Sequence, residues 1–167
     1  MGLFDKLFNK KEELLVVDNQ EIVAIADGEM FDISTVSDEL FASKAMGDGV
    51  AFKFTQDKVT LCSPANGELT VLFPTGHAFG CLTNDGVEIL VHCGINTVEA
   101  NGEGFKILKK KQGDSVKAGE AIVEVDLEKL SKTYDMSTML IITNPNGKTI
   151  KFKEFGNYNK LDSIVER

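Results

Sequence analysis

Short apolar runs, separated by glycine-containing turns, follow one another along most of the chain. Pairs such as Asn66-Gly67 and Asp85-Gly86 divide these runs, and Asx-Gly pairs favour tight reversals of an extended chain. Many short strands at this spacing are typical of an antiparallel β-sandwich or barrel, so we expect an all-β fold. The pattern predicts strands over residues 21–26, 50–54, 58–62, 69–73, 87–91, 105–108, 121–125 and 139–142.

Two further patterns add detail to this expected fold. Residues 36–42 and 127–132 have the pattern of short helices. Residues 26–30 (ADGEM) are similar to residues 65–69 (ANGEL), and each copy joins two predicted strands through an Asx-Gly turn. This internal similarity indicates a duplicated β framework.

The first fifteen residues differ from the rest of the chain. We predict a flexible amphipathic segment over residues 1–15, followed by a single domain over residues 16–167. Such a helix either frays as a chain terminus or binds weakly to a membrane surface. Its apolar face and the basic residues around it are Leu3, Phe4, Leu7 and Phe8, with Lys6, Lys10 and Lys11.

Composition and charge exclude several classes of protein. Hydrophobic residues make up 43% and charged residues 26% of the 167 positions, which is the usage of a globular domain with a sizeable core. The net charge of −8 disfavours binding to the phosphate backbone of DNA or RNA, and it suits a basic protein partner.

The sequence predicts a cytoplasmic protein. No stretch approaches the ~20 apolar residues of a membrane-spanning helix, and the N-terminus lacks the apolar core and cleavage site of a secretory signal. Cys62, Cys81 and Cys93 form no CxxC pair, which favours reduced thiols. Residues 1–15 are the segment through which we expect any association with a membrane.

The chain has only two histidines, His77 and His92, and both lie among small and apolar residues. His77 comes eight residues before Asp85 and His92 seven residues after it. An antiparallel hairpin that turns at Asp85 would therefore place the two imidazoles close together. One ring could then act as a nucleophile and the other could stabilise the anion that forms, with a hydroxyl such as that of Thr75 fixing the second ring's tautomer.

Other interpretations of the two histidines stay open at this point. They could be unrelated surface residues. They could belong to a zinc peptidase, but catalytic zinc needs three protein ligands and two histidines supply at most half of a site. A zinc ion shared with a partner protein is a secondary alternative. A non-catalytic regulator that inhibits a transporter through the same surface is a further one.

Longer motifs carry a resemblance to a known family. The chain resembles glucose-type enzyme IIA of the bacterial phosphoenolpyruvate:sugar phosphotransferase system over about residues 1–143. The fold that this resemblance implies is an antiparallel β-sandwich of the duplicated hybrid motif type. The motifs are residues 41–49 (FASKAMGDG), 63–67 (SPANG), 76–80 (GHAFG), 85–98 (DGVEILVHCGINTV), 102–105 (GEGF) and 113–125.

The resemblance also implies roles for particular residues. His92 would accept a phosphoryl group on Nε2, His77 would stabilise that group, and Thr75 would hydrogen-bond His77. The phosphocarrier HPr would be the donor and a sugar-specific IIB domain of a permease the acceptor. No metal or nucleotide cofactor would be required, because the donor is already an activated phosphohistidine. The implied docking residues are Asp38, Phe41, Ala45, Met46, Phe73, Phe79, Leu90 and Asn96.

Some positions depart from the family pattern. Asn96 stands where the family usually has Asp, which removes one expected charge from the docking surface. The segment after Asn144 also leaves the pattern. The N-terminal residues 1–7 resemble a membrane-tethering helix of free-standing members. In some bacteria such proteins also regulate permeases and kinases, and we hold that role open for this chain.

Overall fold

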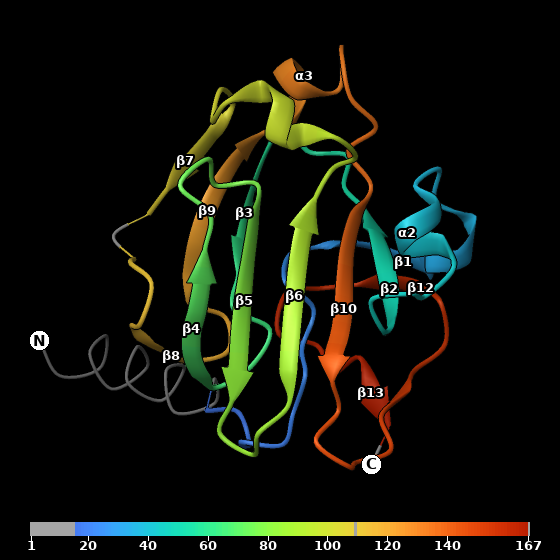
Figure 1. Cartoon of the computed structure of the whole chain (residues 1–167), viewed down its shortest axis with the longest axis vertical. Helices are drawn as coiled ribbons and strands as arrows, with labels where there is room; N and C mark the ends of the chain where they lie inside the picture. Colours follow the sequence, from blue (N-terminus) through green and yellow to red (C-terminus); the bar gives the residue numbers. More distant parts are fainter. Residues whose placement is uncertain (1–15, 109, 167) are drawn as a thin grey trace, which may run out of the picture.

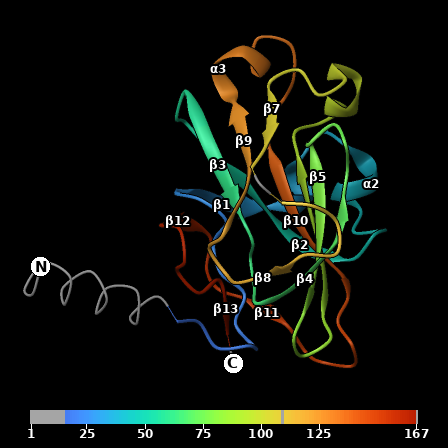
Figure 2. The same cartoon turned by 90° about the vertical axis from the view of Figure 1, so that its left-hand side faces the viewer.

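Antiparallel pairing joins every strand to its neighbours in the part of the chain that the structure describes. The structure is a computed structural model that describes residues 16–108 and 110–166, so the predicted segment 1–15 lies outside it. An eight-stranded sheet has the order β12-β1-β2-β10-β6-β5-β4-β8, and a three-stranded sheet has the order β3-β9-β7. A small sheet pairs β11 with β13. Figure 1 shows the three-stranded sheet behind the large one, and Figure 2 shows the two sheets from the side.

The strands are short, as expected from the turn spacing. In the large sheet they are β1 (Gly28–Asp32), β2 (Asp48–Lys53), β4 (Gly67–Leu72), β5 (Ala78–Thr83), β6 (Glu88–Cys93), β8 (Ser115–Val116), β10 (Thr138–Asn144) and β12 (Gly156–Tyr158). The others are β3 (Lys58–Cys62), β7 (Phe105–Ile107), β9 (Ala121–Asp126), β11 (Lys151–Phe152) and β13 (Val165–Glu166). The helices are α2 (Glu39–Ala42), α3 (Leu127–Leu130) and the 3-10 helices η1 (Ile33–Thr35) and η2 (Thr97–Ala100).

The main hydrophobic core lies between the two layers. Strand alternation sends Ile89 and Val91 of β6 inward, where they belong to one buried cluster with Val123 and Val125 of β9. Each such side chain contributes about 1.5–3 kcal/mol when fully buried. This core fixes which residues of β6 face outward, namely Glu88, Leu90 and His92.

A second hydrophobic cluster lies on the outer surface of the large sheet. The segment of η1 and α2 contributes Ile33 and Phe41, which pack with Met139 and Ile141 of β10. Asp38 begins α2, since its carboxylate accepts a hydrogen bond from the amide of Leu40. The α2 segment therefore forms a wall beside the outward face of β6.

The structure confirms most of the predicted elements and corrects one. Seven of the eight predicted strands and both short helices are present, most of them with shifted ends. Residues 21–26 are not a strand, because their hydrogen bonds go to different segments instead of to one partner. Val23 donates to Pro64, whereas Ala24 donates to Asp162. Only an isolated bridge between Val23 and Ser163 remains of the predicted strand.

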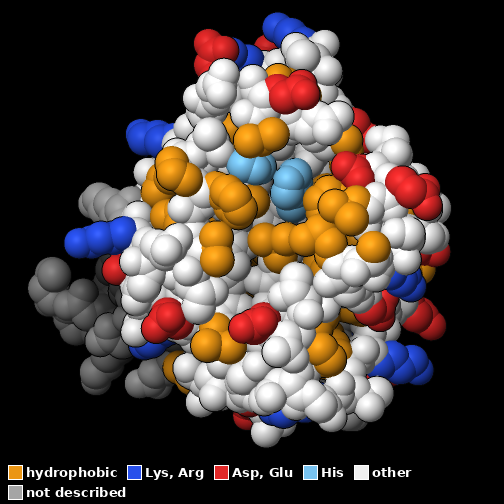
Figure 3. Space-filling view, in the orientation of Figure 1, with side chains coloured by type: hydrophobic (Ala, Val, Ile, Leu, Met, Phe, Trp, Pro, Cys, Tyr) orange, Lys and Arg blue, Asp and Glu red, His pale blue; other side chains and the backbone are white. Residues whose placement is uncertain are grey.

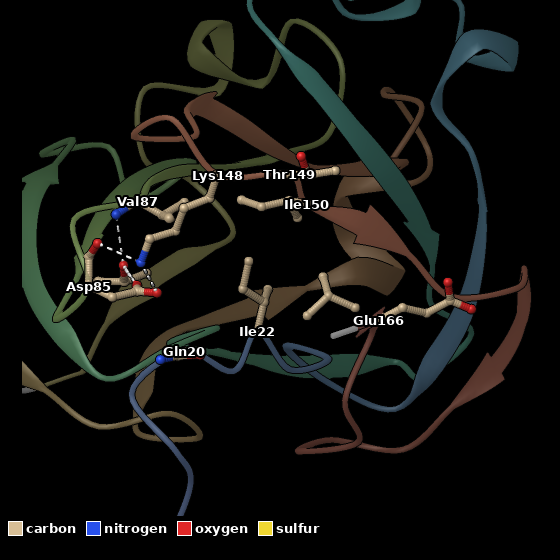
Figure 4. A pocket seen from close by; sticks show the side chains of 10 residues that line it. Gln20, Ile22, Asp85, Val87, Lys148, Thr149, Ile150 and Glu166 are labelled. Atoms are coloured by element: carbon tan, nitrogen blue, oxygen red, sulfur yellow. Dashed lines mark hydrogen bonds and ion pairs between the residues drawn. The ribbon is translucent and has the colours of Figure 1, made fainter.

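The C-terminal segment closes the end of the large sheet that carries the turn between β5 and β6. A cavity of about 360 Å³ lies there, with apolar walls that include Ile22 and Ile150. Figure 4 shows the side chains that line it. Lys148 donates to the Asp85 carboxylate at 2.6 Å, so these two polar groups satisfy each other. The cavity therefore lies where the β5–β6 hairpin meets the segment that follows β10.

No helix among residues 16–108 and 110–166 is long and apolar enough to cross a membrane.

Candidate functional site

The hairpin of β5 and β6 brings the two histidines together. Ala78 is the cross-strand partner of His92, so His77 lies one residue outside this pair. The two ring centroids are 5.1 Å apart and the rings meet edge to face, with an angle of 80° between their planes. His77 is buried, with 4% of its surface exposed, and His92 is half-buried. Both reach the surface that faces the viewer in Figure 3.

One hydrogen bond fixes the tautomer of His92. Its Nδ1 lies 2.9 Å from the carbonyl oxygen of Gly94. A carbonyl oxygen only accepts hydrogen bonds, so Nδ1 carries the proton and Nε2 keeps a free lone pair. Gly94 has a positive φ of 81°, and a Cβ there would lie 2.4 Å from the side chain of Thr97. Glycine is therefore required at the residue that orients His92.

A tight turn positions His77 and its hydroxyl partner. The amide of Gly76 donates to the carbonyl of Phe73 at 2.8 Å, with Pro74 setting φ near the start of the turn. The turn places Thr75 Oγ1 2.5 Å from His77 Nδ1, which is the contact that the resemblance implies. This hydroxyl can donate to Nδ1 or accept from it, so the bond orients the His77 ring in either tautomer.

Both imidazoles are neutral at neutral pH. Burial lowers the pKa of His77, and the neighbouring His92 lowers it further. Burial also lowers the pKa of His92, although the Gly94 carbonyl and the Asp38 carboxylate act in the opposite direction. A neutral ring with a free Nε2 is a nucleophile, whereas a protonated ring is not.

Hydrophobic side chains surround the two rings. Phe41 of α2 lies 4.9 Å from His92 between ring centroids, and Phe73 lies 5.1 Å from His77. Figure 3 shows hydrophobic side chains on several sides of the histidines. We call this surface the histidine face, and define it by His77, His92, Phe41, Met46, Phe73 and Leu90.

The other residues of the predicted docking surface lie in different settings. Ala45 and Asn96 are exposed, and Asp38 is half-buried at the start of α2. The prediction for Phe79 is wrong, because this side chain is only 1% exposed and belongs to the main core. Its neighbour Ala78 pairs with His92 and shares the outward face, so strand alternation sends Phe79 inward.

Sequence reasoning missed three groups near this site. Leu40 and Val98 are large apolar side chains that are 52% and 53% exposed. Leu40 lies in α2 beside Phe41, and Val98 lies in η2, which follows β6. Apolar residues next to a motif give no sign of which one faces solvent. The Gly94 carbonyl was also missed, since main-chain groups leave no trace in the residue type.

The sulfur and metal chemistry of the site is limited. Cys93 follows His92 but is fully buried, and burial raises the pKa of its thiol to about 12. Among residues 16–108 and 110–166, no three His, Cys, Asp or Glu side chains come together as metal ligands. A zinc ion on the two histidines would therefore need further ligands from outside these described residues.

Comparison with known proteins decides among the alternatives. Residues 20–147 match the family model of the phosphoenolpyruvate-dependent sugar phosphotransferase system, EIIA 1. The chain belongs to this family. EIIA proteins are phosphotransferase components that carry phosphoryl groups during sugar uptake, so this chain is a phosphoryl carrier and not a zinc peptidase.

Individual relatives agree with this assignment to the EIIA family. The glucose-specific EIIA component of Haemophilus influenzae is 40% identical over 166 residues, which are 99% of this chain and 97% of that protein. The glucose-specific EIICBA component of Staphylococcus carnosus is 37% identical over 145 residues, which are 86% of this chain but 21% of that longer protein. The solved structure of glucose permease IIA from Mycoplasma capricolum has a TM-score of 0.80 and 35% identity, and the match covers 87% of this chain and 93% of that one. The predicted all-β fold is confirmed.

Proposed function

We propose that this EIIA protein accepts a phosphoryl group from phospho-HPr on Nε2 of His92 and passes it to the IIB domain of a sugar permease. The observation that carries the proposal is the hydrogen bond from His92 Nδ1 to the Gly94 carbonyl, which leaves Nε2 as the free nucleophilic atom. The His77 ring, 5.1 Å away between centroids, lies where it can stabilise the transferred group.

The transfer is an exchange of one N–P bond for another. The lone pair of His92 Nε2 attacks the phosphorus in line, and the donor N–P bond breaks with its electron pair going to the donor imidazole. While Nδ1 keeps its proton, the phosphorylated ring carries a positive charge. The Gly94 carbonyl and the Asp38 carboxylate stabilise that charge, which is also why both raise the pKa of His92.

His77 takes part as a hydrogen-bond donor in this scheme. The Thr75 hydroxyl donates to His77 Nδ1, which leaves the imidazole proton on Nε2, where it can bond a phosphoryl oxygen. The ring stays neutral because burial and the nearby His92 lower its pKa. The apolar rings of Phe41 and Phe73 limit the access of water, which would hydrolyse the N–P bond.

The histidine face is the docking surface in this proposal for both HPr and the IIB domain. Exposed apolar side chains such as Leu40 and Phe73 supply area that a partner can cover. Phosphorylation of His92 would add negative charge at its centre, and this change would alter any contact with permeases or kinases that the protein regulates. Cytoplasmic location, with membrane contact through residues 1–15, stays a prediction.

Zinc bound between the histidines and a partner is a secondary proposal. The donor set fits only in part, because both rings are neutral but residues 16–108 and 110–166 bring no third ligand to them, so a partner would supply the rest. His77 would have to offer the Nε2 lone pair, with Nδ1 donating to Thr75. Zinc and phosphate would therefore compete for Nε2 of His92.

Labelling with a defined phosphoryl donor tests the main proposal. The protein is incubated with phosphoenolpyruvate, enzyme I and HPr, and the product is examined for an acid-labile, base-stable phosphoryl group. His92→Ala abolishes labelling, whereas His77→Gln still accepts phosphate but passes it on poorly. Labelling that survives in His92→Ala, or that never forms in the unaltered protein, contradicts the proposal.

A further inference from the structure

The segment before β10 is joined directly to the loop that orients His92. The amide of Ile95 donates to the carbonyl of Asp135 at 2.8 Å, and the amide of Gly94 donates to the carbonyl of Ser137 at 3.0 Å. Gly94 in turn accepts the hydrogen bond from His92. The main chain of Asp135 therefore lies beside the loop that follows His92, at an edge of the histidine face.

The carboxylate of Asp135 is exposed but held in place. Its Oδ1 accepts from the amide and the hydroxyl of Ser137 at 2.9 and 2.7 Å. Within the described part of the chain, its Oδ2 accepts one long bond of 3.4 Å, from the hydroxyl of Ser37. A fixed carboxylate with one oxygen still accessible loses little conformational freedom when a cation binds it.

Asp135 lies on the same side of the histidine face as Asp38. Ser37, which reaches Asp135, directly precedes Asp38, and the Asp38 charge acts on His92. Asn96, on the adjoining loop, is neutral. Figure 3 shows acidic side chains beside the hydrophobic ones around the histidines, with Lys and Arg nearer the outline of the molecule.

Charge complementarity indicates what meets this edge. The chain has a net charge of −8, and a phosphorylated donor brings further negative charge toward His92. Like charges across an interface are costly, so the donor must present Lys or Arg beside its phosphoryl group, and the receiving surface needs acidic groups away from the reacting nitrogen. We infer that Asp135, together with Asp38, receives a Lys or Arg side chain of the phosphoryl-donor protein and is a specificity residue for that donor. The inference rests on the proposed function.

Phosphorylation kinetics of the full chain test this role. With phospho-HPr as donor, Asp135→Asn is expected to lower the second-order rate by about fivefold at low ionic strength, and the loss shrinks in high salt. Glu124→Gln, which removes one charge from β9 in the other sheet, is the matched control and leaves the rate unchanged. With phosphoramidate, a small donor without a docking surface, Asp135→Asn and the unaltered protein react equally.

A second substitution tests whether the loss of rate comes from the missing negative charge or from a change in local structure. Adding Asn96→Asp to Asp135→Asn returns a negative charge to the adjoining loop and is expected to recover part of the rate with phospho-HPr. The inference is overturned if Asp135→Asn, like Glu124→Gln, leaves the rate of phosphorylation by phospho-HPr unchanged. It is also overturned if Asp135→Asn lowers the rate with phosphoramidate as much as the rate with phospho-HPr. If phospho-HPr never labels the unaltered protein, the proposed function itself is contradicted. If it labels the unaltered protein and Asp135→Asn at the same rate, the proposed function stands and only the role of Asp135 is contradicted.

Discussion

The amide of Cys93 donates a hydrogen bond of 2.7 Å to the carbonyl of His77. This bond joins the main chain of one site histidine to the residue that follows the other. The register of β5 and β6 therefore sets how close the two rings lie, while the Thr75 hydroxyl and the Gly94 carbonyl orient them. Groups held by paired strands keep the narrow geometry that a phosphoryl transfer needs.

The first prediction concerns the protonation of the two histidines. Nuclear magnetic resonance titration is expected to give both a pKa below about 6.5, the ordinary value for histidine, because burial disfavours the charged rings. Asp38→Asn lowers the pKa of His92 further, since the Asp38 carboxylate raises it. Asp57→Asn, a change of an exposed residue on a different loop, leaves it unchanged. A His92 midpoint at or above about 6.5 contradicts the lowered pKa.

The same shifts set the sign of a stability effect. Between the lowered folded pKa values and about 6.5, the unfolded chain binds more protons at His77 and His92 than the folded protein does. The contribution of these two groups to the free energy of unfolding therefore falls as pH drops below about 6.5. Replacing both with Gln removes this part of the pH dependence, which denaturant titrations at several pH values can measure.

The second prediction concerns the residue that orients His92. Gly94→Ala places a Cβ 2.4 Å from Thr97 at a positive φ, and is expected to cost about 1–3 kcal/mol of stability and to slow labelling of His92. Gly113→Ala is the matched control, because Gly113 also has a positive φ but an added Cβ would meet nothing within 4 Å. The difference in labelling rate between the two variants isolates the effect at the His92 loop. Equal labelling rates would argue against a role for the Gly94 carbonyl.

The third prediction concerns Thr75. Thr75→Val removes the hydroxyl beside Nδ1 of His77, and transfer from phosphorylated His92 to the IIB domain is expected to slow by about 10-fold, as when other orienting partners of histidine are lost. Thr75→Ser retains the hydroxyl and most of the rate. Acceptance of phosphate by His92 is largely retained in both. If the Val and Ser variants transfer equally well, the hydroxyl has no orienting role.

The fourth prediction contrasts two phenylalanines. Phe79→Ala is expected to lose about 3–5 kcal/mol of unfolding free energy, because Phe79 lies in the main core. Phe73 is 41% exposed and contacts His77, so Phe73→Ala leaves stability within about 1 kcal/mol and slows transfer from phospho-HPr. Thermal unfolding and transfer kinetics on both variants check this. The reverse pattern would show that Phe79 and not Phe73 serves docking.

Much of the site could be predicted from sequence because it is built on one hairpin. The turn at Asp85 and the positions of His77 and His92 on either side of it follow from local pattern, and local pairing is the part of a sheet that sequence determines best. The expected roles of His92, His77 and Thr75 came from the family resemblance that the longer motifs carry. Residues 21–26 resisted prediction because their hydrogen-bonding partners come from distant parts of the chain, including Asp162.

Other features depended on tertiary packing. Strand β12 pairs with β1 across most of the chain length, and neither has a strong alternating pattern. Whether Phe79 faces outward or into the core depends on which residue of β5 pairs with His92, and a shift of one residue in this register would reverse it. The exposure of Leu40 depends likewise on how α2 lies on the sheet.

The second hydrophobic cluster has a consequence for how such a carrier can change over time. Ile33 and Phe41 rest on the outside of the large sheet, apart from the residues that hold its two layers together. Substitutions in this cluster would change the shape of the wall beside His92 at some cost in stability, because its members are buried, but they would leave the contacts between the two layers in place. The surface that a partner protein would meet can therefore differ among members of this family without any change at Nε2 of His92.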